Sequence, residues 1–194
     1  RNQFYSKYDP SRFNAQNYPP NIQNKYIPQY RMNCYGYAFR YILDGAAPIV
    51  DGYIYPYKQQ PGNFTSAEKR NQVKELYNYT NATDYMNAVV SNIKLDAERV
   101  GYAITECPLT SSTAQQYGTS SRLIALVTGY NGRGFDYHFY MQHNDGTWSH
   151  KPGATEVTNL SLDDNVILTN ENIYSKANQG TYTGNNLKFF LITK

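Results

Sequence analysis

The chain has 194 residues, which is long enough for one domain with a substantial core and short for two. Its 18 Lys and Arg residues nearly balance its 15 Asp and Glu residues, and the formal net charge is only +3. From its length we expect a single domain over residues 1–194. Because the basic residues form no block of the kind that binds phosphate backbones, we expect no nucleic-acid partner.

The apolar residues are spread in short runs. The longest clear run covers residues 123–127, whereas a membrane-spanning helix needs about 18 apolar residues, so we expect no membrane span. The sequence begins with Arg1 rather than Met, which is typical of a chain from which a leader, pro-segment or tag has been removed. We therefore expect a secreted protein or one that acts at the cell surface.

The first 30 residues have the composition of an irregular segment. Pro10, Pro19, Pro20 and Pro28 stand there among Tyr and Asn residues. We expect residues 1–30 to form an extended arm laid over the domain.

A short amphipathic helix is predicted directly after this arm. Apolar side chains recur at Cys34, Ala38, Tyr41 and Ile42, which is the spacing of one helix face, and the Asp-Gly pair at 44–45 is a stop signal. The sequence therefore predicts a helix over residues 34–43 with Cys34 in its first turn.

Two more helices and then a set of strands are predicted. Ser66 can cap a helix over residues 67–77, and Thr83 or Asp84 can start another that runs through Ile93. Short runs typical of β-strands follow at 102–106, 122–130, 136–142, 147–151 and 187–193. Helices that precede a group of strands indicate an α+β fold, with N-terminal helices packed on a C-terminal antiparallel sheet.

All three histidines of the chain lie within residues 136–153, DYHFYMQHNDGTWSHKPG. The segment from His143 to residue 147 suits a hairpin with a three-residue loop, in which Gly146 adopts the left-handed conformation. In that register Tyr140 faces His150, and His138 and His150 become diagonal neighbours within reach of a hydrogen bond between their rings. A two-residue loop would turn His150 to the opposite face, so the functional interpretation depends on this turn. His143 lies in the turn itself and is expected to be exposed to solvent.

A cysteine at a helix start and a histidine pair are the parts of an activated thiol. The unpaired backbone N–H groups and the positive end of the helix dipole stabilise a thiolate, whose normal pKa is about 8.5. His138 would accept the thiol proton and return it to the leaving group, while His150 would fix its tautomer and orientation. Gly36 leaves room beside the thiol, and the backbone N–H of Cys34 can donate to an oxyanion.

The segment Asn33-Cys34-Tyr35-Gly36-Tyr37-Ala38 resembles the nucleophile helix of papain-like peptidases and amidases, especially the NlpC/P60 branch. In that branch a strand begins with the catalytic His, and a third polar residue, often a second His, follows about a dozen positions later, as His150 follows His138 here. NCYGYA and DYHFYMQ…WSHKPG also resemble the NCYAYA-like and DYHWYRQ…WSHKPG-like motifs of a group of uncharacterised bacterial proteins. The resemblance implies a papain-like fold, a Cys34-His138-His150 triad and hydrolysis of an amide bond through a thioester, with no cofactor and no metal.

The chain departs from the NlpC/P60 pattern in three ways. Asp-Cys-Ser-Gly of that branch is Asn-Cys-Tyr-Gly here, the spacing from Cys to His is long, and residues 66–93 have no counterpart. The substrate therefore stays open among a protein, a peptidoglycan stem peptide and a side-chain amide, as for a deamidase or a transglutaminase-like toxin domain. Papain-like enzymes place an oxyanion-hole Gln six residues before the Cys, and Gln29, five before, is the candidate here. The remaining candidates are Asn33 and Asp136 as supporting residues, and Tyr35, Gly36 and Trp148 as substrate-pocket residues.

Three other interpretations of the same residues compete with catalysis. Cys34 could form a disulfide with Cys107, as cysteines of secreted chains often do. Cys34, His138 and His150 could together bind zinc. The chain could also be a catalytically silent, Tyr-rich binding or matrix protein, since it has 21 Tyr residues against 8 Phe and a single Trp.

Overall fold

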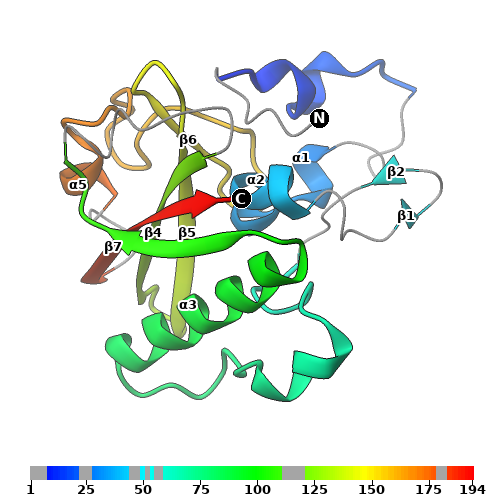
Figure 1. The fold of residues 1–194 in the computed structure, drawn as a ribbon. Coiled ribbons are helices and arrows are strands. Elements are labelled where there is room, and N and C mark those ends of the chain that lie inside the picture. Colours follow the sequence, from blue (N-terminus) through cyan, green and yellow to red (C-terminus); the bar gives the residue numbers. More distant parts are fainter. Residues whose placement is uncertain are drawn as a thin grey trace.

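A five-stranded antiparallel sheet forms the centre of the protein (Figure 1). The computed structural model of the chain describes residues 8–21, 28–43, 49–50, 53–54, 59–110, 121–177 and 183–194. The strand order is β3-β7-β4-β5-β6. The strands are β3 (Ala103–Cys107), β4 (Ser121–Tyr130), β5 (Phe135–Gln142), β6 (Trp148–His150) and β7 (Thr183–Thr193).

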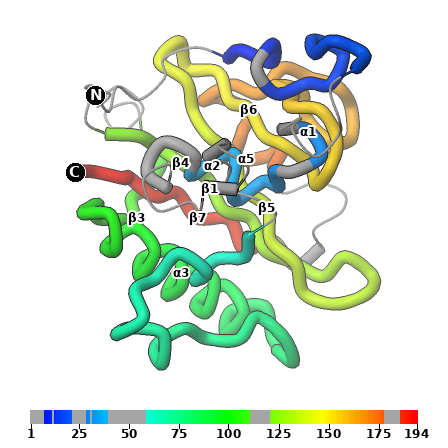
Figure 2. The backbone as a smooth tube through the Cα atoms, turned by 90° about the vertical axis from the view of Figure 1, so that its right-hand side faces the viewer, coloured from blue at the N-terminus to red at the C-terminus, as the bar shows by residue number. Residues whose placement is uncertain are grey.

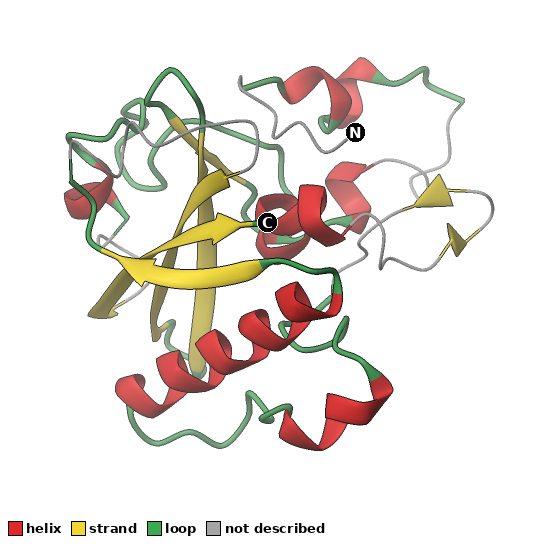
Figure 3. Cartoon of the chain, viewed as in Figure 1, coloured by secondary structure: helices red, strands yellow, loops and turns green. Residues whose placement is uncertain are grey.

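Two helices cover one face of this sheet (Figure 3). They are α2 (Cys34–Leu43) and α3 (Ala82–Arg99), and their buried side chains form one hydrophobic cluster with inward-facing residues of β4, β5 and β7. A second, smaller cluster covers the other face and includes Ile173 of α5 (Ile173–Lys176). The fold is therefore mixed α+β, with helices packed on an antiparallel sheet as the sequence predicts.

The remaining elements are short. They are the 3-10 helices η1 (Pro10–Arg12), η2 (Ala15–Asn17) and η4 (Ala67–Gln72), the single turn α1 (Pro28–Arg31), and a two-stranded sheet of β1 (Ile49–Val50) and β2 (Tyr53–Ile54). Figure 2 shows the N-terminal segment at the end of the molecule where β6 and α1 lie, and α3 at the opposite end. None of the helices in the described part of the chain combines the length and apolar character of a membrane span.

The hairpin of β5 and β6 has the predicted turn and register. The N–H of His143 donates to the carbonyl oxygen of Thr147 (2.8 Å), and Gly146 has a left-handed φ of +80°. Tyr140 lies opposite His150. Because side chains alternate along a strand, His138, Tyr140 and His150 share the face opposite to α2.

The structure differs from the sequence predictions in three places. The helix predicted over 67–77 is only the 3-10 helix η4, and α3 is capped by Asn81 and runs on to Arg99. Strand β7 begins at Thr183 rather than at 187 because its first residues pair with the end of β4, where Thr183 lies opposite Tyr130. The arm is not extended throughout, since η1 and η2 interrupt it, and residues 1–7 and 22–27 lie outside the described part.

The described part of the arm lies on the domain, as expected. The hydroxyl of Tyr8 donates to the carbonyl oxygen of Val157 (3.0 Å), and Asn14 accepts the N–H of the same residue (2.8 Å). The ring of Phe13 contacts that of Tyr37 on α2 edge-on, with centroids 5.2 Å apart. The arm thus packs against both α2 and the loop that follows β6.

A candidate active site at the edge of strand β5

Cys34 stands at the first position of α2, directly after its cap. The side-chain oxygen of Asn33 accepts the N–H of Gly36 (2.9 Å), which is the hydrogen bond of a helix N-cap. The side-chain amide of Asn33 also donates to the carbonyl oxygen of Gln59 (2.9 Å). These two bonds fix where α2 begins, and so where the thiol lies.

The sulfur of Cys34 lies against the backbone on both sides of His138. It is 4.0 Å from the carbonyl oxygen of Tyr137, and the backbone N–H of Phe139 is directed toward it. The C=O of residue i and the N–H of residue i+2 point to the same side of a strand. On this side of β5 lies the short strand β6, which within the described residues pairs only with residues 140–142. The backbone of residues 137–139 therefore has no neighbouring strand on this side in the described part of the chain. Cys34 occupies this open edge.

His138 and His150 form the predicted hydrogen-bonded pair. His138 Nε2 lies 2.8 Å from His150 Nδ1, and His150 Nε2 lies 2.7 Å from the carbonyl oxygen of Leu160. A carbonyl oxygen only accepts, so His150 carries its proton on Nε2 and its Nδ1 is an acceptor. His138 must then donate from Nε2, which leaves its Nδ1 as the basic nitrogen. The relay thus selects one tautomer of His138.

Burial keeps both imidazoles neutral. It lowers the pKa of His138 well below its ordinary 6.5, and the neighbouring His150 lowers it further. Burial likewise lowers the pKa of His150 to about 4, although the carbonyl of Leu160 opposes the shift. His138 is therefore an unprotonated base at neutral pH.

The thiol of Cys34 is also neutral in this state, contrary to the expected thiolate. Burial raises the pKa of Cys34 to about 12, because only 6% of the residue is exposed. The N–H of Phe139 lowers this pKa and the carboxylate of Asp136 raises it. Desolvation outweighs the helix start here. The thiol and the imidazole of His138 are thus both neutral, so they form no thiolate–imidazolium ion pair in this structure.

The predicted supporting residues have mainly structural partners. The side-chain oxygen of Gln29 accepts the N–H of Ala15 (2.6 Å), so it is bound to the arm. The carboxylate of Asp136 accepts the N–H of Tyr137 (2.7 Å), whereas the ring of His138 is oriented by His150. Asn33 acts as the cap described above.

The predicted substrate-pocket residues are buried. Tyr35 is 0% exposed and donates its hydroxyl to Asp96, and Trp148 is 0% exposed and donates to Asn170 (2.9 Å). Gly36 is buried in the first turn of α2. In this structure Tyr35 and Trp148 are core side chains, because each belongs to a hydrophobic cluster.

His143 is not exposed as predicted, since only 1% of it reaches solvent. Its Nε2 lies 2.6 Å from Ser149 Oγ, which in turn lies 2.6 Å from the hydroxyl of Tyr37. The ring of Tyr8 covers it edge-on, with centroids 6.1 Å apart. The packing of the arm on the turn accounts for this burial.

The two cysteines are free and far apart in the sheet. Cys34 lies beside β5 and Cys107 ends β3, three strand spacings away. At about 4.8 Å per spacing this separation of about 14 Å is too long for a disulfide. Within the described residues no group of three or more His, Cys, Asp or Glu side chains is placed to hold a metal ion.

The sequence analysis missed two groups of the site, Tyr140 and the carbonyl of Leu160. Tyr140 packs against both imidazoles, with ring centroids 4.9 Å from His138 and 4.7 Å from His150. Strand alternation from His138 could have identified it. The carbonyl of Leu160 could not have been identified, because it reaches His150 only through the chain return that pairs His150 with Thr158.

Comparisons with known proteins match a limited part of the chain. No family model and no solved structure matches it. Insoluble matrix shell protein 1 of Ruditapes philippinarum is 51% identical over 60 residues, which are 31% of this chain and 38% of that protein. The chain therefore spans well under half the length of the curated relative that it matches.

Proposed function

We propose that the protein is a cysteine hydrolase of papain-like type that cleaves a peptide or peptide-like amide. The proposal rests above all on the relay from the carbonyl of Leu160 through His150 to His138, which ends in a basic Nδ1. It is supported by the position of the Cys34 sulfur against the backbone that flanks His138. Nucleophilic catalysis requires a base of fixed tautomer and a thiol that can reach it, and here the thiol lies against the strand residues on either side of that base.

In the proposed reaction the Cys34 thiol transfers its proton to Nδ1 of His138 as the sulfur attacks the substrate carbonyl carbon. The backbone N–H at the start of α2 donates to the resulting oxyanion. The C–N bond then breaks, the amine leaves with the proton from His138, and a thioester remains on Cys34. Water then attacks the thioester while His138 accepts its proton, the C–S bond breaks, the carboxylic acid product leaves, and the proton on His138 returns to the sulfur of Cys34. His150 holds the ring of His138 throughout.

The test measures the rate of iodoacetamide alkylation of Cys34 between pH 6 and 9 by mass spectrometry. We expect His138→Ala to slow alkylation of Cys34 below pH 8 by at least about tenfold, because the general base is lost. His150→Ala should slow it less. Cys107 is the internal control, since its rate should be the same in all three proteins.

Equal rates at Cys34 in the wild type and in folded His138→Ala, at every pH, would contradict the proposal. Circular dichroism establishes that each variant is folded. A rate that changes equally at Cys34 and Cys107 would indicate a general loss of structure, and His138→Gln, which keeps a polar side chain there, would then be measured instead.

A second candidate function is that of a catalytically silent matrix protein. It is favoured by the identity with an insoluble shell matrix protein over 60 residues. In this case the buried thiol and the histidine pair serve packing alone, and Cys34→Ala should leave every functional property unchanged. Both candidates fit a secreted or surface-acting protein, which we also propose.

A further inference from the structure

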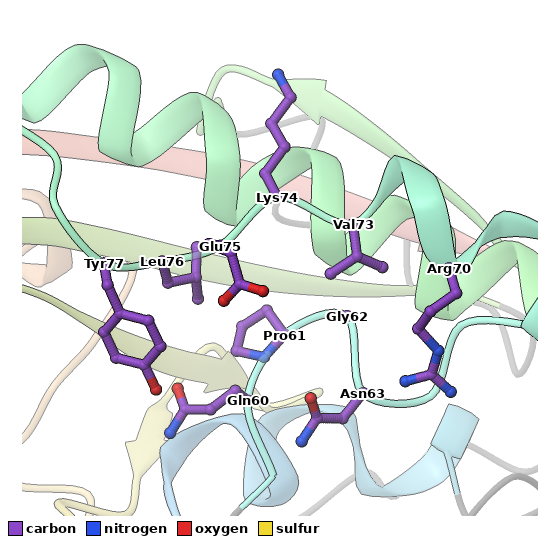
Figure 4. A pocket seen from close by; sticks show the side chains of 10 residues that line it. All are labelled: Gln60, Pro61, Gly62, Asn63, Arg70, Val73, Lys74, Glu75, Leu76 and Tyr77. Atoms are coloured by element: carbon purple, nitrogen blue, oxygen red, sulfur yellow. The ribbon is translucent and has the colours of Figure 1, made fainter.

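A cavity of about 360 Å³ lies between the loop 60–63 and the segment 70–77 (Figure 4). Buried Asn92 of α3 holds both walls: its amide donates to the carbonyls of Pro61 (3.1 Å) and Lys74 (2.8 Å), and its oxygen accepts the N–H of Lys74 (2.9 Å). Gly62 lines the cavity with a φ of +99°, and a Cβ there would meet the side chain of Val73 at 2.8 Å. The cavity, which we call the 60–77 groove, is therefore preformed.

Hydrogen bonds connect one end of the 60–77 groove with the residues around the candidate nucleophile, which does not itself line the groove. The side chain of Gln60 accepts the hydroxyl of Tyr137 (2.6 Å), and the carbonyl of that same Tyr137 contacts the sulfur of Cys34. The preceding residue, Gln59, is bound by Asn33, which immediately precedes Cys34. Two independent hydrogen bonds thus connect residues 59 and 60, where the groove begins, to Asn33 and Tyr137, which both neighbour the thiol.

The charged side chains of the groove are divided between its ends: Glu75 lies toward Gln60, and Arg70 lies at the far end beside Asn63 (Figure 4). In Figure 4 the carboxylate of Glu75 and the phenol of Tyr77 point toward the loop 60–63, whereas the side chain of Lys74 points away from it. Among the described residues no Lys or Arg forms an ion pair with Glu75. Asp136, whose carboxylate raises the pKa of Cys34, adds a second negative charge near the thiol.

We propose that the 60–77 groove binds the substrate of the Cys34 site, and that this substrate is a peptide with a Lys or Arg side chain close to the scissile amide. This inference rests on the proposed function. Glu75 would pair with the cationic side chain and Tyr77 would offer its ring face to it. The side-chain amides of Gln60 and Asn63 would bind the peptide backbone.

The experiment uses Cys34→Ala protein and fluorescein-labelled hexapeptide pools in which one position is fixed as Arg, Gln or Glu. Fluorescence anisotropy measures binding without any reaction at Cys34. We expect the Arg pools to bind more tightly than the Glu pools. Glu75→Gln should weaken the Arg pools by about fivefold, which is the size of one exposed ion pair, and leave the Gln pools unchanged.

Glu68→Gln is the matched control, because Glu68 is an exposed carboxylate of η4 that does not line the groove. Equal binding of Arg and Glu pools, or equal weakening by Glu68→Gln and Glu75→Gln, would overturn the inference. If Glu75-dependent binding is found but the protein with Cys34 intact cleaves none of the Arg peptides, the groove stands and the hydrolase proposal fails. If cleavage occurs and Glu75→Gln does not alter the preference among pools, the hydrolase stands and the groove inference fails.

Discussion

Cys34 is subject to opposing electrostatic effects of its own neighbours. The start of α2 and the N–H of Phe139 favour the thiolate, whereas burial and the carboxylate of Asp136 disfavour it. Burial and the charge of Asp136 outweigh the stabilising groups, and the pKa of Cys34 rises to about 12. Asp136→Asn removes this charge and keeps an oxygen that can accept the N–H of Tyr137, although it loses the exposed hydrogen bond from the side-chain amide of Asn131 (3.1 Å).

Asp136→Asn should therefore lower the pKa of Cys34 and speed its alkylation at a given pH. The lost charge raises the thiolate fraction by about two- to fivefold if the interaction is worth about 0.5–1 kcal/mol, a value typical of a pair that water partly screens. The pH dependence of iodoacetamide labelling measures the shift. Asp136→Glu keeps the charge and should behave as the wild type, and equal labelling of the Asn and Glu variants would show that the charge has no influence.

The histidines show what strand periodicity can and cannot predict. His138 and His150 could be paired from the sequence because a two-residue period and one glycine turn determine which side chains share a face. His143 could not be placed, because its burial depends on Tyr8, 135 positions earlier in the chain, and on Ser149 across the hairpin. Long-range packing of an irregular arm leaves no local pattern.

Long-range contacts also explain why the segment after η4 is not the helix that the sequence predicts. Its composition predicts a helix to residue 77, but η4 ends at Gln72. Asn92 binds both the N–H and the C=O of Lys74, and a helix would need these groups for its own hydrogen bonds. By contrast, α2 has the predicted bounds because its cap and its apolar spacing are local signals.

Asn92→Ala should destabilise the protein by about 2–4 kcal/mol, because it leaves the buried carbonyl of Pro61 and the part-buried N–H and carbonyl of Lys74 without their partner. Chemical denaturation measures the change in the free energy of unfolding. Asn87→Ala, at an exposed position of the same helix, is the matched control and should be neutral or slightly stabilising, since Ala has the higher helix propensity. Similar losses in both variants would contradict the role of Asn92 as the link between the two groove walls.

For the whole molecule, the order of helices and strands along the chain is enough to predict the α+β class. The strand order β3-β7-β4-β5-β6 is not predictable in this way, because the last strand enters the middle of the sheet between β3 and β4. Polar residues at the start of β7 also give no alternating pattern, although they pair with β4. The sheet in turn separates Cys34 from Cys107, which the sequence left as a disulfide candidate.

Buried titratable groups also make the stability of the whole molecule depend on pH. The pKa of His150 is lowered to about 4 and that of His138 well below 6.5, so the folded state binds fewer protons than the unfolded state. The stability that the pair contributes is present above about pH 6.5 and is lost as the pH falls toward 4. Asp96 acts in the opposite sense: its pKa is raised to about 6, mainly by burial, so its contribution is present below about pH 3.8 and is lost as the pH rises through 6.

On acidification from pH 6 to 4 the two histidines lower the free energy of unfolding, whereas the single carboxyl of Asp96 raises it. The free energy of unfolding should therefore fall overall. Asp96→Asn removes the opposing group, while its amide oxygen can still accept the N–H of Gly62 and the hydroxyl of Tyr35. The fall from pH 7 to pH 4 should then become steeper, by about 2–3 kcal/mol. Urea denaturation at half-unit pH steps measures both curves. A variant curve parallel to that of the wild type would mean that Asp96 does not titrate in this range, and a wild-type curve that rises toward pH 4 would mean that the histidine pair is not buried in its neutral form.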